Sequence, residues 1–481
     1  MQKRQPAHKS YATLPHEMLL GTVTPFAIFQ LFFTDNQLQM IVENTNKYEQ
    51  TKGFSDSCPW SPLTLKVWIA LIIYINMGIH KIYAVEDLWN CNERKPIHSI
   101  KDFMSLVRFQ QIKHFFHISP PGETQFFWYS KVEPLASHLR NMFKKLYVPG
   151  TNVAVDEMIA RFSGRSIHTV QMKNKPTPEG YKIVSLCDAG YTWTFTFTSR
   201  IEKNREIEQI TGLTDTGCLV WHLVHQLPKT KSYDVYMDNY FSSIALFKYM
   251  CDNGYGACGT VRLNSAKFPA ELKLGKLKYQ HLDWNTLLGK VVENVLAILW
   301  IDNGPVTMLT TIHNIGEEWT VTRERHRPRE TSSNANTVCR VFGNLSRKAL
   351  EIPKIIDDYN HYMGSVDIAD QLRGYYNCQL TVRRTWFPLF FWLLDTTLVN
   401  CFKLYCKATD QKVASKEFRL DLAWDLINST VEDVGKRITR SDLSNTRDTY
   451  LSLSKKFQDI YITETYNLPV TCLIPGGHFM E

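Results

Sequence analysis

The sequence predicts a mixed α/β domain, with strands and helices in the order βββαβαβ, combined with a largely helical region. Up to about residue 150 the apolar residues recur at helical spacing, and beyond Gly150 the period changes to two, which is typical of strands. A chain of 481 residues is also too long for a single core. Two or three domains are therefore expected.

Three stretches before residue 150 predict helices. Each has apolar residues three or four positions apart, and Pro149 and Gly150 end the third stretch. A possible N-cap, Thr34 or Asp35, precedes the first stretch. The apolar residues of these patterns are Leu38, Ile41 and Val42 in residues 34–46, Phe103, Met104 and Val107 in residues 99–119, and Leu135, Leu139, Met142 and Leu146 in residues 130–150.

Beyond Gly150 the alternation predicts three strands in succession, the last two joined at Asp188, Ala189 and Gly190. Trp193 and the phenylalanines that follow are expected on one face of the third strand. The predicted strands cover residues 151–159 and 181–199, and a helix (217–227), a strand (233–237), a helix closed near Gly254 and a strand (255–261) follow.

Residues 263–353 have a different pattern of polar and apolar residues and are interpreted as an insertion. A β-hairpin is expected within residues 295–314, turning at Asn303 and Gly304. A polar, arginine-rich stretch follows it. Helical patterning returns after this segment.

Composition restricts the classes of partner and site. The formal charge of +8 permits an anionic partner, with nucleic acid the leading candidate. Eleven cysteines occur without a CxxC pair or a secretory signal, so reduced thiols are expected and structural zinc is not. The apolar stretches 67–75 and 386–394 fall short of the roughly 20 residues that span a bilayer, so they are expected to be buried helices and no membrane association is predicted.

Three aspartates are candidate catalytic and metal-binding residues: Asp156 in the first strand, Asp238 at the end of the fourth, and Asp367 on the helix after the insertion. The first and fourth strands can lie side by side in a sheet of this order, so their carboxylates can converge. Three carboxylates suit Mg²⁺ or Mn²⁺, and two such ions support phosphodiester chemistry. The alternative for each residue is an ordinary turn or cap. Glu157 is expected on the opposite face from Asp156.

Several stretches together resemble the piggyBac transposase family. They are "VDEMIARFSGR" from residue 155, "NKPTPEGYKIVSLCD" from 174, "YDVYMDNYFSS" from 233, "DDYNHYMGSVDIADQ" from 357 and "RRTWFPLFFWLLDTTLVN" from 383. The resemblance implies an RNase H-like catalytic domain of the DDE/DDD type with Asp156, Asp238 and Asp367 as catalytic acids and Asp370 as a further metal ligand. It also implies metal-dependent nicking of DNA at transposon ends, hairpin formation and transfer into TTAA sites.

The same resemblance implies a domain layout, a homodimer that binds double-stranded DNA, and a nuclear location. The expected segments are a basic N-terminal segment (1–24), a helical dimerisation and DNA-binding region in two parts (25–150 and 377–460), the RNase H-like domain in two parts (151–262 and 354–376), an insertion domain (263–353) and a C-terminal tail (461–481). Cys472 is the one cysteine of that tail, so the family's cysteine-rich zinc domain is not expected there.

Basic and aromatic residues are candidates for DNA contacts. Lys175 and Lys182 follow Asp156 closely and could meet the DNA backbone, while Arg383 and Arg384 could hold a phosphate beside Trp386 stacked on an unpaired base. The alternatives are solvated lysines and a Trp386 buried in the core. The candidates in the insertion are Arg325 and Arg327, within an arginine cluster that also contains Arg323 and Arg329.

Two other functions remain open from the sequence. One is a domesticated protein that keeps the scaffold and binds DNA or chromatin without transposition activity. The other is a repair or RNA-processing nuclease on the same scaffold, since a fold does not fix a function.

Overall fold

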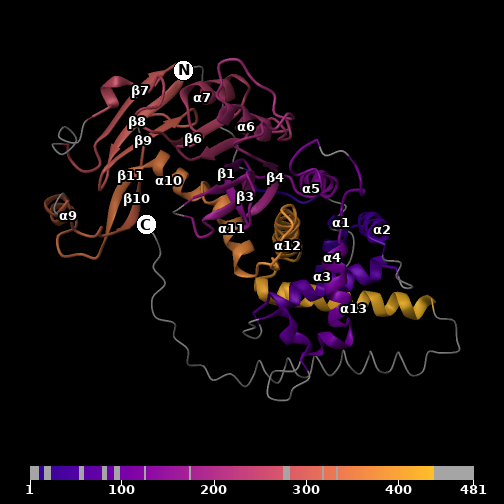
Figure 1. Ribbon diagram of the computed structural model, residues 1–481. Coiled ribbons are helices and arrows are strands. Elements are labelled where there is room, and N and C mark those ends of the chain that lie inside the picture. Colours follow the sequence, from indigo (N-terminus) through magenta and orange to yellow (C-terminus); the bar gives the residue numbers. More distant parts are fainter. Residues whose placement is uncertain are drawn as a thin grey trace.

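The helices from both ends of the chain pack together beside a large mixed sheet (Figure 1). The computed structural model describes residues 10–15, 23–53, 59–78, 84–90, 98–123, 126–172, 175–274, 282–316, 319–331 and 334–437. The predicted tail, residues 461–481 with Cys472, lies outside the described residues.

The helical region combines helices that are distant in sequence. Helix α13 lies against α3, and α1 contacts both α12 and α13. These helices are α1 (Pro25–Phe32), α2 (Asp35–Thr51), α3 (Pro62–Ile75), α4 (Leu106–Phe115), α5 (Glu133–Lys145), α12 (Phe387–Thr409) and α13 (Ser415–Arg437), with short 3-10 turns at Val85–Trp89 and Ser99–Asp102.

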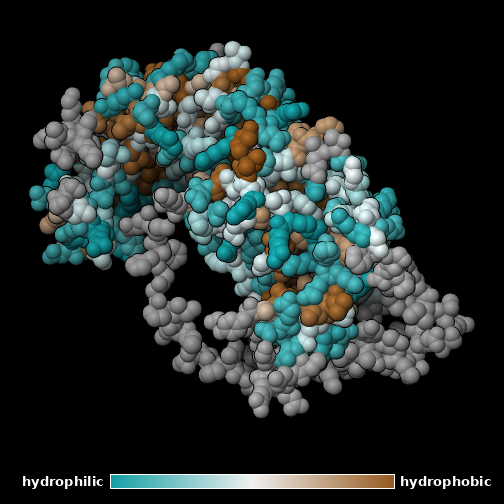
Figure 2. Space-filling model, viewed as in Figure 1, coloured by the Kyte–Doolittle hydropathy of each residue, from teal (hydrophilic) through white to brown (hydrophobic). Residues whose placement is uncertain are grey.

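The two long apolar stretches form buried helices, as predicted. They make up most of α3 and the start of α12. By length and composition α12 could cross a membrane, but 89 % of its most apolar window is buried inside the protein. That burial is typical of a core helix. The visible surface is mainly hydrophilic, with hydrophobic residues in small groups (Figure 2).

The predicted helix boundaries were right in one case and wrong in another. Helix α2 begins after Thr34, whose hydroxyl accepts a hydrogen bond from the Gln37 amide (3.3 Å). The helix expected across residues 99–119 starts only at Leu106, because Ser105 caps it. The residues on its buried face therefore differ from those predicted, and Val107 is 65 % exposed.

The central sheet has strands and helices near the predicted positions, with one short strand, β2, that was not predicted. Along the sheet, β4 pairs with β3, β3 with β1 (both antiparallel), β1 with β5 and β5 with β6 (both parallel). The elements are β1 (Asn152–Arg161), β2 (Thr169–Gln171), β3 (Glu179–Asp188), β4 (Tyr191–Phe197), α6 (Asp215–Val224), β5 (Asp234–Met237), α7 (Ile244–Asp252) and β6 (Gly256–Thr260).

The predicted insertion is not wholly separate from this sheet. The expected hairpin is present as β8 (Val295–Ile301) and β9 (Pro305–Thr310), and β9 pairs with β6, so that β7 (Leu287–Val292), β8 and β9 extend the same sheet. Strands β10 (Thr320–His326) and β11 (Arg347–Pro353) form a ribbon of their own, connected through α9 (Ala335–Phe342).

After the insertion, α10 (Lys354–Tyr362) and α11 (Ser365–Tyr375) return the chain to the sheet. Helix α11 packs on β1, β3 and β4. The β3–β4 turn allows this approach because it contains Gly190, with φ of 89°. A Cβ on Gly190 would lie 2.7 Å from Cγ2 of Ile368 on α11.

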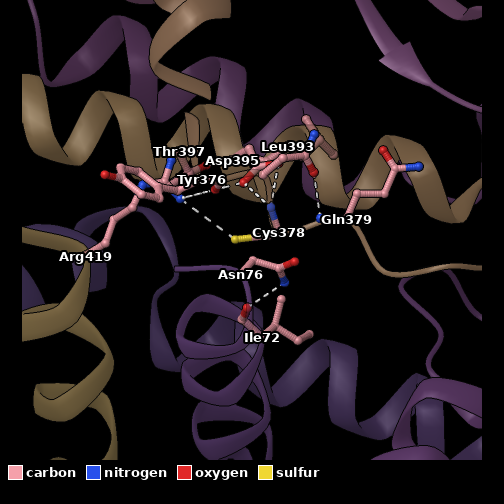
Figure 3. Close-up of polar contacts among 10 residues, drawn as sticks. Ile72, Asn76, Tyr376, Cys378, Gln379, Leu393, Asp395, Thr397 and Arg419 are labelled. Atoms are coloured by element: carbon pink, nitrogen blue, oxygen red, sulfur yellow. Dashed lines mark hydrogen bonds and ion pairs between the residues drawn. The ribbon is translucent and has the colours of Figure 1, made fainter. Parts of the chain in front are cut away.

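A buried polar cluster joins α12 to α13 and to the segment after α11 (Figure 3). Both carboxylate oxygens of Asp395 accept hydrogen bonds from the Cys378 amide (3.0 and 3.2 Å). The Arg419 guanidinium lies 3.8 Å from Asp395 and donates to the Tyr376 carbonyl (2.9 Å). These contacts fix the position of α11 relative to the helical region.

Candidate active site

The pairing of β1 with β5 brings two of the predicted acids together. The strands run parallel in a register that pairs Val155 with Met237, so Asp156 and Asp238 follow at the next position on each strand. Asp156 is 7 % exposed. Its Oδ1 accepts a hydrogen bond from the Glu157 amide (2.7 Å), and Oδ1 of Asp238 accepts one from the Tyr240 amide (2.9 Å).

Negative charge is concentrated around Asp156. Burial, followed by the negative charge of Glu157, raises the pKa of Asp156 to about 8, and Asp238 adds to the rise. Burial also raises the pKa of Asp238, with Glu157 contributing. Both pKa shifts mean that the neighbouring cations do not fully offset the effect of burial and of nearby negative charge on these carboxylates.

Glu157 links these acids to the two predicted lysines. Its carboxylate lies 3.3 Å from Lys175 Nζ and 3.5 Å from Lys182 Nζ. Burial opposes ionisation of Glu157, but Lys182 and Lys175 hold its pKa below the ordinary value. Burial likewise works against the charge of Lys175, yet Asp156 and Glu157 raise its pKa. Both lysines thus lie beside the predicted acids and not on a remote surface.

The role of Glu157 was not indicated by sequence. The strand register puts it on the opposite face from Asp156, as alternation predicts, but its side chain still acts on the charge of Asp156. The one signal for Glu157 in the sequence was that Lys175 and Lys182 follow the acidic pair Asp156 and Glu157 closely.

The third acid comes from α11. Asp367 is exposed at the first turn of this helix, and its charge adds to that of Asp156 and Glu157 in raising the pKa of Lys175. Asp370 is placed differently because Arg373 pairs with it. The guanidinium of Arg373 also donates to the Ile159 carbonyl of β1 (3.1 Å). Asp370 therefore helps to anchor α11 on the sheet.

The predicted metal can be tested against these residues. Across the part of the chain that the structure describes, no three His, Cys, Asp or Glu side chains meet as a ready metal site. The donor chemistry nevertheless fits a hard divalent cation, since the acids supply oxygen ligands, and a cation would favour the charged forms that burial and neighbouring acids disfavour. Asp156, Asp238 and Asp367 are the residues that would hold it.

Two of the three candidate residues before α12, Arg384 and Trp386, mainly contact other parts of the protein. Trp386 is 5 % exposed and packs on Phe116 and Phe387, which corrects the prediction that it stacks on a base. The Arg384 guanidinium donates to the carbonyls of Phe116 (2.7 Å) and Lys113, and burial lowers its pKa to about 10. Its donors are therefore engaged within the protein, whereas Arg383 is exposed.

The arginine cluster of the insertion is largely ion-paired. Arg325 contacts Asp302 (2.7 Å), and Arg323 makes two hydrogen bonds to Asp357 (2.6 and 2.8 Å). Arg327 pairs with Glu330. Alternation along β10 puts these arginines on one face, but acids neutralise much of the charge that was predicted to meet DNA.

A mixed sheet that gathers carboxylates at the ends of neighbouring strands is typical of enzymes that cut or join phosphodiester bonds. Comparison with known proteins agrees with that class. The family model described as Transposase IS4 matches residues 24–402. The chain belongs to this family of DDE transposases, in its piggyBac branch.

Similar proteins include two from Homo sapiens. PiggyBac transposable element-derived protein 3 is 23 % identical over 432 residues, covering 86 % of this chain and 67 % of that protein. PiggyBac transposable element-derived protein 2 is 22 % identical over 463 residues, covering 91 % and 72 %. A cryo-EM structure of the piggyBac transposase synaptic complex with hairpin DNA has the same fold, with a TM-score of 0.72, 19 % identity, and 98 % and 90 % of the two chains covered.

Proposed function

We propose that this chain is a DNA transposase of the piggyBac type, which nicks transposon ends, forms a hairpin and transfers the strand into TTAA sites. The carrying observation is that β1 and β5 pair so that Asp156 and Asp238 are neighbours, while Asp156 and Asp367 both act on the charge of Lys175. Family membership supports the class of reaction. The sheet order β4-β3-β1-β5-β6 supports an RNase H-like catalytic domain.

The chain's own residues have separable roles in this proposal. Asp156, Asp238 and Asp367 would hold Mg²⁺ or Mn²⁺, two ions in the complete site. When bound, such ions activate a nucleophile and stabilise the leaving oxygen in phosphodiester chemistry. Lys175 and Lys182 hold Glu157 and offer positive charge to the DNA backbone. Arg373 pairs with Asp370 and bonds to the Ile159 carbonyl of β1. These contacts hold α11 on the sheet and so keep Asp367 in place.

The proposed partner is double-stranded DNA, namely transposon ends and a TTAA target, bound by a homodimer in the nucleus. The structural neighbour supports DNA as the partner, because it is a synaptic complex with hairpin DNA. The helices of residues 25–150 and 377–460 are proposed as the dimerisation and DNA-binding region. Within the described residues they pack together, as α3 with α13 and α1 with α12.

The test is nicking of TTAA-flanked DNA by the full chain in Mg²⁺. Asp156→Asn, Asp238→Asn and Asp367→Asn are each expected to reduce nicking to background. The matched control is Asp252→Asn, since Asp252 is an exposed acid that pairs with Lys248 on α7. Intact nicking by all three variants would refute the assignment.

A second function is a domesticated DNA-binding protein without transposition activity. It is favoured by the two human relatives, which are named as transposable element-derived proteins. Salt-sensitive DNA binding by the wild-type chain, without nicking in Mg²⁺ or Mn²⁺, would support it.

A further inference from the structure

A cavity of about 540 Å³ opens beside the catalytic acids. Glu157 and Asp238 lie in its wall at one end, and residues from the loop between β4 and α6 form much of the rest. Val170, Ile207 and Leu219 give it an apolar part. A cavity of this size, with an apolar part in a mainly polar and charged lining, can take one nucleotide in addition to the strand that is cut.

Tyr240 is the aromatic residue of this cavity and is held close to Asp238. Its amide donates to Asp238 Oδ1 (2.9 Å), so the backbone of Tyr240 lies beside that carboxylate. Lys182 Nζ lies 3.9 Å from the ring centroid, and the ring meets Phe241 edge to face (5.0 Å). Tyr240 nevertheless remains 48 % exposed. Part of this residue is therefore accessible to a ligand, with Lys182 over one face of the ring.

Cationic side chains around the same cavity suit a phosphate backbone. Arg200 and Arg262 line it together with Lys182 and Lys203, and the two lysines are paired there with Glu157 and Asp215. Nε of Arg262 donates to Asn239 Oδ1 (3.1 Å), which places this guanidinium next to the acid and the ring. An exposed aromatic ring with cations around it is the combination that binds unpaired bases in single strands.

We propose that the cavity holds an unpaired nucleotide of the DNA, with its base stacked on Tyr240 and its backbone beside Lys182 and Arg262. The inference rests on the proposed function and assigns it a base-binding position. Hairpin formation requires strands to separate near the cut, and an enzyme that holds an unpaired base must replace the stacking that is lost. Trp386, predicted for this task, is buried, whereas Tyr240 is exposed next to Asp238.

The test uses the full chain without divalent metal, so that binding is measured apart from cleavage. The probe is a short single-stranded oligonucleotide that contains 2-aminopurine, whose fluorescence falls when it stacks on an aromatic ring. Tyr240→Ala is expected to weaken binding by roughly 5- to 100-fold and to remove the quenching. Tyr240→Phe keeps the ring and is expected to bind within about twofold of wild type. Tyr11→Ala is the matched control, since Tyr11 is 89 % exposed and lies outside the cavity.

Three results would overturn the inference: wild-type protein that does not bind the oligonucleotide, Tyr240→Ala that binds and quenches as wild type does, or Tyr240→Phe as weak as Tyr240→Ala. Failure of the proposed function looks different, because the wild type would then bind and quench through Tyr240 without nicking DNA in Mg²⁺. If both hold, Tyr240→Ala lowers hairpin formation more than first-strand nicking.

Discussion

Asp395 and Asp156 are both buried carboxylates, but their surroundings are opposite. Asp395 accepts two hydrogen bonds from the Cys378 amide and faces the buried Arg419 guanidinium (Figure 3). Asp156 accepts one amide hydrogen bond, and the charges that act on it are Glu157, the cation Lys175 and Asp238. Burial raises the pKa of both acids, but Arg419 counters the rise at Asp395, whereas Glu157 adds to it at Asp156.

The difference is the one expected between a structural acid and an acid that binds metal. A buried charge with a partner and hydrogen bonds is a fixed part of the fold. Acids crowded together without full compensation destabilise each other until a cation arrives, which is typical of sites that bind metal.

Removal of Arg419 is expected to have the largest effect on stability. Arg419→Met leaves Asp395 buried without its cation, which costs about 3 to 5 kcal/mol. Urea unfolding followed by tryptophan fluorescence measures the change. The double variant Arg419→Met with Asp395→Leu is expected to regain most of the loss, because an apolar pair removes the uncompensated charge. If the single and double variants were equally unstable, packing and not charge would explain the cluster.

Substitution of Asp370 is expected to weaken activity without abolishing it. Asp370→Asn loosens the contact with Arg373 that anchors α11, so nicking should fall about 10-fold, the usual effect of a residue that supports a metal ligand. Arg373→Met should reproduce it. The measurement is the initial rate of nicking. Nicking at background in Asp370→Asn would instead make Asp370 a direct ligand, as the resemblance implies.

Metal ions are expected to stabilise the acidic site selectively. Mg²⁺ or Mn²⁺ at ten times its dissociation constant should add about 1.4 kcal/mol to the free energy of unfolding. Thermal unfolding with and without EDTA measures this as a rise in Tm. The rise should vanish in Asp156→Asn, which lacks one proposed ligand, and persist in Asp252→Asn. An equal rise in both variants would locate the effect elsewhere.

The smallest expected effect concerns Arg383. This residue is exposed, so Arg383→Ala should lower the salt dependence of DNA binding by about one phosphate contact and leave Tm unchanged. Arg384→Ala should do the reverse, because Arg384 bonds to carbonyls at the end of α4. Binding titrations over a range of salt, with Tm measured in parallel, separate the two. An unchanged salt slope in Arg383→Ala would remove it from the DNA contacts.

Local patterns determined much of the secondary structure. Alternation located β1, β3 and β4, and the turn signal at Asn303 and Gly304 located the β8–β9 hairpin, because side-chain period and turn chemistry are properties of neighbouring residues. The same local information failed at Val107, because the helix starts only after the cap residue Ser105 and buries Phe109 and Ile112 instead. Three acids were also selected from their positions at strand and helix ends.

The surroundings of each charged side chain follow from the tertiary structure and could not be predicted from the sequence. Trp386 became a core residue, Arg384 bonded to distant carbonyls, and Glu157 joined the site, because burial and ion pairing depend on which segments meet in space. Residue types and spacing in the sequence determined that Asp156, Asp238 and Asp367 were available. The parallel pairing of β1 with β5 made Asp156 and Asp238 neighbours, and the packing of α11 on the sheet let Asp367 act on Lys175, since those contacts join residues far apart in the chain.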